Sequence, residues 1–257
     1  KVAGSSNNFS LGTLELFVRA AACLVSRRPP NEALEPLMQL YATLSGNYEK
    51  NYLLFESVAM IRAIHPEIDP FFNKIETDFI IPLVGGQIVI DDCTSLFRMI
   101  SFFSLKVFNM NVLTDLLVFG LRHTNSIVTI AACKCARRVL RSFDTSGTNF
   151  PNLNYNTNFN NVGHVQQEQE NTNEEVKDTL EHLTFALLPP LVVSITDGIH
   201  STATGPLVHL LFDLFTKNEE FDPSCSGIAS EFLKNLMKFC QEPQSGVFQK
   251  VTDLLVQ

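Results

Sequence analysis

The sequence lacks tryptophan and has only four tyrosines, whereas phenylalanine occurs 21 times. It also lacks the regular alternation of apolar and polar residues that is typical of strands. No apolar run reaches the roughly 18 residues that a membrane-spanning helix needs. The longest candidate, residues 79–90, is interrupted by Pro82, Gly85 and Gly86. We therefore expect neither a sheet-based fold nor a membrane span, and a core filled by phenylalanine and aliphatic side chains.

The common catalytic and nucleotide-binding motifs are absent. The sequence contains no G-x-x-x-x-G-K-[ST], G-x-G-x-x-G, H-E-x-x-H or G-x-S-x-G pattern. Its six histidines are scattered, and each fits a solvated or capping residue better than a general base. Asp91 and Asp92 form a pair of carboxylates, but an aspartate at a helix start normally satisfies free backbone amides. We expect no catalytic residue, no cofactor and no enzymatic activity.

Six cysteines are present, and only Cys133 and Cys135 are closely spaced. Two residues of a helix that are two positions apart point in different directions, and no second pair or histidine cluster completes a ligand set. We therefore expect no metal site, and reduced thiols in a reducing compartment. The formal net charge of −8 argues against direct binding of nucleic acid or of an anionic membrane. The composition fits a soluble protein of the cytoplasm and nucleus.

Amphipathic helices follow one another along nearly the whole chain. Apolar residues recur at helical spacing, and proline, glycine, aspartate and asparagine mark the boundaries. Asp69 followed by Pro70 predicts a helix start, as do Asp91 or Asp92, and Asn109 or Asn111. The pattern predicts helices over residues 11–25, 31–44, 52–65, 69–84, 91–107, 112–121, 126–141 and 174–201, with further helices from about 204, 224 and 246.

Pairing these helices gives hairpins that begin near residues 33, 69, 111, 175 and 224. Their loose period favours HEAT-type repeats, which average about 40–47 residues per helix pair. Residues 144–173 are rich in asparagine and poor in large aliphatic residues, which predicts a disordered insert. We expect an all-α, HEAT-like helical-hairpin solenoid over residues 1–143, the Asn-rich insert at 144–173, and a continuation of the same solenoid over 174–257.

A stripe of basic residues stands out in the helix at 126–141. Lys134, Arg137, Arg138 and Arg141 share one helical face, and this segment contains no acidic residue. One interpretation is a solvated face near a helix C-terminus, where cations are favoured. The other is a surface for an acidic or phosphorylated protein, because the predicted second helices of the hairpins are basic as a group. The candidate binding residues are then Arg19, Arg62, Arg98, Lys134, Arg137, Arg138 and Arg141.

From residue 35 onwards the order of elements resembles the C-terminal third of a nuclear transport receptor of the importin-β superfamily, in the transportin-SR branch. The resemblance is carried by DCTSLFRMI at 92–100, LTDLLVFGLRH at 113–123, AACKCARRVL at 131–140 and the long helix around 187–199. It implies protein cargo, exchange controlled by the GTPase Ran through an N-terminal part outside this chain, and nucleoporin binding by the full-length protein. Since the chain opens at Lys1 without a methionine, we expect it to be part of a longer protein.

The chain departs from this branch in its first helix. The resemblance implies that an arginine-rich helix of transportin-SR, which reads phosphorylated Arg/Ser-rich cargo, corresponds to residues 11–25. Here that helix keeps only Arg19, followed by Arg27 and Arg28, so the cargo class and the direction of transport stay open. The alternative function is a HEAT or armadillo scaffold subunit of a complex with no role in transport.

Overall fold

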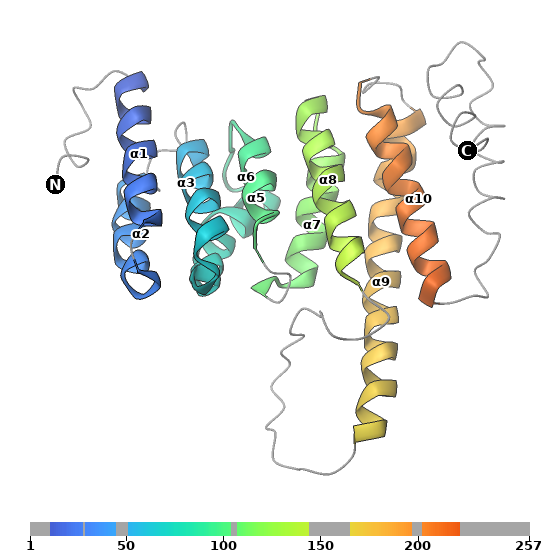
Figure 1. Cartoon of the computed structure of the whole chain (residues 1–257). Coiled ribbons are helices and arrows are strands. Elements are labelled where there is room, and N and C mark those ends of the chain that lie inside the picture. Colours follow the sequence, from blue (N-terminus) through green and yellow to red (C-terminus); the bar gives the residue numbers. More distant parts are fainter. Residues whose placement is uncertain are drawn as a thin grey trace. The chain divides into compact units, whose positions relative to one another are not determined.

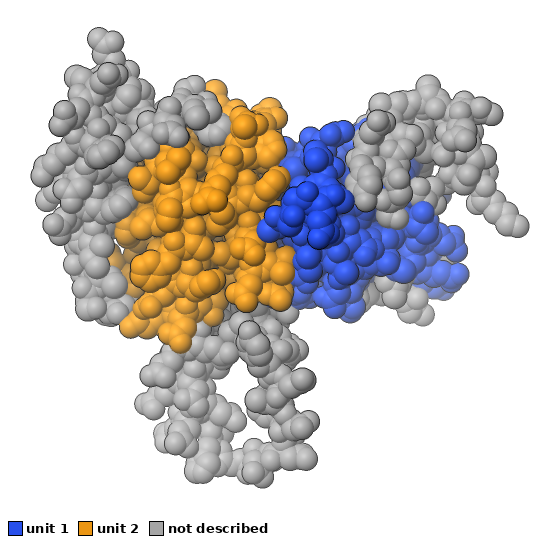
Figure 2. Space-filling model, turned by 180° about the vertical axis from the view of Figure 1, so that it is seen from behind, with its two compact units in different colours: residues 1–108 blue, residues 109–257 orange. Residues whose placement is uncertain are grey.

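The computed structural model describes residues 11–27, 29–44, 51–103, 107–143, 165–196 and 202–221. All regular secondary structure in these ranges is helical, which confirms the expected all-α class for this part of the chain (Figure 1). The chain divides into two compact units, Lys1–Phe108 and Asn109–Gln257, and Figure 2 colours them separately. No helix in the described ranges is long and apolar enough to cross a membrane.

Unit 1 is a succession of helices that largely follows the predicted order. They are α1 (Leu11–Ser26), α2 (Pro30–Leu44), α3 (Asn51–Ile64), the continuous helical segment formed by η3 (Pro66–Phe71), α4 (Phe72–Ile75), η4 (Glu76–Ile80) and α5 (Ile81–Val84), and then α6 (Cys93–Ile100). Helix α3 packs against α1 and α6, while α2 packs against α1, α3 and η3. Figure 1 shows α3 between α1 and α6.

Phenylalanine fills the core of unit 1, as the composition predicts. The rings of Phe55 and Phe79 meet edge to face with centroids 5.4 Å apart. The ring of Phe72 lies 5.0 Å from that of Phe103 and 4.3 Å from that of Phe108. Such edge-on and tilted aromatic pairs stabilise a core beyond the area that they bury, so these contacts join α3, α4 and η4 to the end of the unit.

The predicted helix start at Asp69 is wrong. The helical segment begins at Pro66, because a proline suits the first turn, where its missing N–H would have no partner within the helix. Asp69 lies inside η3 and does not act as a cap. Instead, its carboxylate accepts two hydrogen bonds from the guanidinium of Arg62, and the Nη2–Oδ2 distance is 3.1 Å.

The same segment continues through Pro82 by means of a wide turn. Pro82 has no N–H to donate, and in a regular α-helix its ring would clash with the carbonyl of Asp78. The π-helical turn η4, Glu76–Ile80, precedes it and accommodates the interruption. The segment then ends at Gly85 and Gly86, and Gly86 adopts a positive φ of 68° that a residue with a side chain would rarely adopt.

Unit 2 contains α7 (Met110–Leu121), α8 (Ser126–Ser142), α9 (Val165–Thr196) and α10 (Thr204–Phe221). Helix α7 packs against α8 and α9, and α10 packs against the same two helices. The side chain of Asn109 caps α7 by accepting a hydrogen bond from the backbone N–H of Asn111 at 3.0 Å, which confirms one of the two predicted caps. Asn125 caps α8 in the same way, through the N–H of Ile127 at 2.9 Å.

The expected insert overlaps the first part of α9. This helix begins at Val165 and contains Pro189 and Pro190, whereas the sequence predicted a start near residue 174. Residues 144–164 lie outside the described ranges, as do the predicted helices that begin near 224 and 246. Within the described part of α9, the hydroxyl of Ser194 donates a hydrogen bond to the carbonyl of Leu121 at 2.9 Å and so ties α9 to α7.

Candidate protein-binding surface

Helix α8 presents the candidate basic stripe. Its buried side consists of small and β-branched residues at helical spacing, including Val128, Ala132 and Val139. Burial of this side fixes the rotation of the helix, because the opposite side then has to face solvent. Lys134, Arg138 and Arg141 are exposed as a result. We call these three residues the α8 basic strip.

Arg137, the fourth predicted member of the stripe, has a different environment. Its Nε donates a hydrogen bond to Oδ2 of Asp213 on α10 at 2.5 Å, and each side chain is 29% exposed. The pair therefore lies at the contact between α8 and α10 and is partly shielded from water. This geometry gives Arg137 a structural contact that the sequence pattern did not reveal.

The α8 basic strip has no charge neutralisation of its own. Helix α8 contains no acidic residue, and none of the three strip residues forms an ion pair within the described ranges. Arg141 lies in the last turn, where the helix dipole favours a cation. Exposed charges of one sign at this spacing attract an anionic partner by long-range electrostatics, although each single contact in water is weak.

The basic character of the second helices does not extend to α10. This helix carries Asp213, Glu219 and Glu220 against a single basic residue, Lys217. Lys217 also forms an ion pair with Glu220, with Nζ and Oε2 2.5 Å apart. Of the two second helices in the described part of unit 2, only α8 is therefore basic.

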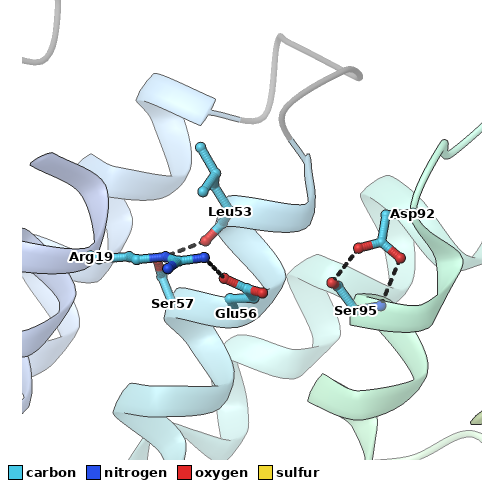
Figure 3. A network of polar contacts seen from close by, with 6 residues as sticks. All are labelled: Arg19, Leu53, Glu56, Ser57, Asp92 and Ser95. Atoms are coloured by element: carbon cyan, nitrogen blue, oxygen red, sulfur yellow. Dashed lines mark hydrogen bonds and ion pairs between the residues drawn. The ribbon is translucent and has the colours of Figure 1, made fainter. Parts of the chain in front are cut away.

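In unit 1, the predicted binding residue Arg19 joins two helices. Its Nη2 lies 3.3 Å from Oε2 of Glu56, so an ion pair links α1 to α3 (Figure 3). The side chains remain 54% and 33% exposed, respectively. A pair this exposed contributes little to stability, and a competing anionic partner could reach the guanidinium at a small cost.

Arg62 is the least accessible of the seven candidates. Its side chain is 12% exposed and forms the paired hydrogen bonds with Asp69 described above. The guanidinium carbon also lies 5.7 Å from the centroid of the Phe103 ring, which is close enough for a cation–π contact. Arg62 therefore holds α3, η3 and Phe103 together. Arg98, on α6, is exposed and forms no ion pair in the described ranges.

The seven candidates thus separate by unit and by environment. Lys134, Arg138 and Arg141 lie together on α8, with Arg137 beside them but paired to Asp213. Arg19, Arg62 and Arg98 belong to unit 1. The sequence missed the acidic partners because two of the three pairs join residues 37 and 76 positions apart. Only the Arg62–Asp69 pair, separated by seven positions, is local enough to have been suspected.

Asp91 and Asp92 do not form a paired-carboxylate site. Oδ1 of Asp92 accepts hydrogen bonds from the backbone N–H groups of Thr94 and Ser95 at 3.0 and 3.3 Å. Its Oδ2 accepts a hydrogen bond from the hydroxyl of Ser95 at 2.6 Å (Figure 3). Asp92 is therefore the N-cap of α6, which confirms one of the two predicted caps, and its oxygens accept hydrogen bonds at the helix start.

Cys93, Cys133 and Cys135 are buried. Burial raises the pKa of Cys133 and of Cys135 to about 12, since the interior disfavours a thiolate. Burial, and then the charges of Asp92 and Asp91, raise the pKa of Cys93 to about 11. These thiols are neutral at physiological pH and pack as small apolar side chains. No cluster of His, Cys, Asp or Glu in the described ranges could hold a metal ion.

One histidine is buried rather than solvated. His65 is only 4% exposed, and its Nε2 lies 2.9 Å from the carbonyl oxygen of Ser26. It is therefore not solvated, and its ring lies against the carbonyl of the last residue of α1, so that it joins the ends of α1 and α3. The sequence around His65 gave no signal for this contact, because the contact joins two residues that are 39 positions apart and depends on how α1 and α3 pack.

Comparison with known proteins gives no match. No protein-family model matches the chain, no curated protein matches it, and no solved structure matches it. The functional conclusion therefore depends on the packing of the helices and on the charges that they expose.

Proposed function

We propose that this chain is the C-terminal HEAT-repeat part of a nuclear transport receptor and that it binds protein cargo on its concave face. Cargo exchange is then controlled by Ran with bound GTP, through a part of the protein N-terminal to this chain. Nucleoporins bind the full-length protein, which acts in the cytoplasm and the nucleus. The resemblance of the sequence to the importin-β superfamily supplies the class of function.

The observation that carries the proposal is the pattern of helix contacts within each unit. In a stack of helical hairpins, a helix packs against its own hairpin partner and against the equivalent helix of the next hairpin. In unit 1, we assign α1, α3 and α6 as the second helices of successive hairpins, and α2 as a first helix. Helix α3 packs against both α1 and α6, and α2 contacts η3, which opens the next first helix. In unit 2, α8 packs against α10 and α7 against α9, while α7–α8 and α9–α10 are hairpin pairs. We take this contact order as support for HEAT-type repeats.

The α8 basic strip supports an acidic or phosphorylated cargo. It lies on a second-helix position, and in a hairpin solenoid these positions line the inner surface. Lys134, Arg138 and Arg141 are all exposed and free of intramolecular ion pairs within the described ranges. Arginine favours carboxylate and phosphate partners because its planar guanidinium can donate two parallel hydrogen bonds.

A second candidate function is a HEAT or armadillo scaffold that holds a complex together outside transport. The observation that favours it is the internal use of predicted binding residues. Arg19, Arg62 and Arg137 each pair with an acidic side chain of the same unit. A scaffold needs no continuous basic inner surface, whereas a receptor that binds acidic cargo through these arginines needs them accessible.

Binding measurements on the full-length protein separate the two functions. A transport receptor binds Ran loaded with a GTP analogue and binds nucleoporin repeats, whereas a scaffold binds neither. For the strip, Arg138→Glu should weaken binding of an acidic cargo by about tenfold, which is the effect of losing one charge-assisted contact. The matched control is Arg122→Glu, an exposed arginine at the end of α7. Equal effects of the two substitutions would remove the strip from the binding surface.

A further inference from the structure

An apolar stripe is exposed on α1. Leu16, Ala20 and Leu24 are spaced four residues apart and lie on one side of the helix, with Leu16 72% and Leu24 66% exposed. The opposite side of α1, which includes Val18 and Ala22, is buried. Helix α1 is therefore apolar on two sides, and among the described residues of unit 1 only one of these sides is buried. We call Leu16, Ala20 and Leu24 the α1 stripe.

The packing of unit 1 indicates what fits this stripe. Helices α1, α3 and α6 form one layer, in which α3 has a neighbouring helix on each side. Helix α1 packs most extensively against α3 and α2, which leaves the side with the stripe open. A repeat at the end of a stack normally has a polar outer face. The α1 stripe lacks that polar character and has instead the apolar character of a side that receives another repeat.

The shape of the stripe also suits a helix. Side chains four residues apart form a ridge along a helix surface, and such a ridge packs into the groove of a second helix. The small Ala20 between two leucines allows close approach of the second helix at the centre of the contact. Contiguous apolar surface of this kind is a typical site of macromolecular contact.

We propose that the α1 stripe is a stacking surface covered by the apolar side of a helical hairpin that precedes α1 in the same polypeptide. That hairpin continues the layer formed by α1, α3 and α6. The proposal rests on the proposed function in one respect, because it requires further hairpins before this chain. It does not require that those hairpins bind Ran.

The test compares the same substitutions in this 257-residue chain and in the native polypeptide that contains it. Leu16→Glu combined with Leu24→Glu alters the stripe. Val89→Glu combined with Ile127→Glu is the matched control, because these apolar residues are 77% and 61% exposed elsewhere. In the 257-residue chain, both pairs should leave the melting temperature unchanged. In the native polypeptide, only the stripe pair should accelerate amide hydrogen exchange in α1, by about tenfold or more.

Several results would overturn the proposal. A lower melting temperature of the 257-residue chain with the stripe pair alone would mean that the chain itself covers the stripe. Unchanged exchange in the native polypeptide, or a native polypeptide that begins at Lys1, would mean that no preceding hairpin covers it. A native dimer that the stripe pair dissociates would identify a second copy as the occupant. Failure to bind Ran with normal protection of α1 would reject the transport function and leave the stacking proposal intact.

Discussion

The pair formed by Arg137 and Asp213 offers the sharpest test of how unit 2 is held together. Two opposite charges at about 4 Å attract by about 4 kcal/mol at an effective dielectric constant near 20. Desolvation and side-chain ordering offset most of this, so that exposed pairs contribute about 0–1 kcal/mol, whereas breaking a buried pair costs about 3–5 kcal/mol. With both side chains 29% exposed, we expect Arg137→Ala to lower the free energy of unfolding by about 1–2 kcal/mol.

A double-mutant cycle measures this contribution. Urea unfolding of the wild type, Arg137→Ala, Asp213→Ala and the double variant gives the coupling energy between the two side chains, which we expect to be about 1 kcal/mol. The matched control is a second cycle that uses Arg138→Ala in place of Arg137→Ala. Arg138 is an exposed neighbour on the same helix, and its coupling to Asp213 should be close to zero. The charge swap of Arg137→Asp with Asp213→Arg should recover part of the lost stability.

Equal destabilisation by Arg137→Ala and Arg138→Ala would refute this reasoning, as would a coupling energy near zero. The expected result also decides how the binding surface is probed. The sequence pattern treats Arg137 and Arg138 as equivalent, and so predicts that reversing both charges weakens an acidic partner without unfolding the protein. Because Arg137 contacts α10, its reversal should also destabilise unit 2, so only the α8 basic strip is suited to binding experiments.

Three further predictions concern helix α6 and the cysteines. Asp92→Ala should lower the free energy of unfolding by about 1 kcal/mol in chemical denaturation, because α6 loses its N-cap. Asp92→Asn keeps a cap oxygen and should destabilise the protein much less. Equal destabilisation by the two substitutions would contradict the role of Asp92 as the cap. Iodoacetamide followed by peptide mass spectrometry should modify Cys23 in the native protein and spare Cys133 and Cys135, which are buried; rapid native labelling of either buried thiol would contradict this. Stability should fall as pH rises above 9, because the thiols of Cys133 and Cys135 have an ordinary pKa of 9.0 in the unfolded chain and a pKa of about 12 in the folded protein. Between these values each thiol lowers the free energy of unfolding by about 1.4 kcal/mol per pH unit. Replacing Cys133 and Cys135 by alanine should therefore reduce the slope of stability against pH.

The order of helices could be predicted from the sequence because its signals are local. Apolar spacing predicted α1, α3 and α8 to within one or two residues. The sequence narrowed each of two caps to two candidates, Asp91 or Asp92 and Asn109 or Asn111, because a capping side chain bonds backbone groups only two or three residues away; the structure shows Asp92 and Asn109. The start predicted at Asp69 was wrong because Pro66 already opens the helical segment and Arg62 binds the carboxylate.

The candidate site was less predictable, because its electrostatics depend on contacts between distant segments. The exposed face of α8 follows from local spacing, and the structure keeps Lys134, Arg138 and Arg141 on it. The pairing of Arg19 with Glu56 and of Arg137 with Asp213 depends on which helices pack together. No pattern within a single helix distinguishes a free arginine from one paired across a helix contact.

The most direct test of the proposed transport function is the binding of the full-length protein to Ran. Titration calorimetry with Ran carrying a non-hydrolysable GTP analogue should give saturable binding, and Ran carrying GDP should bind far more weakly. A shift in the affinity for an acidic cargo upon addition of the GTP form would complete the expected result. Absence of binding to either form of Ran, with the protein folded and its helices intact, would contradict the account and favour a scaffold.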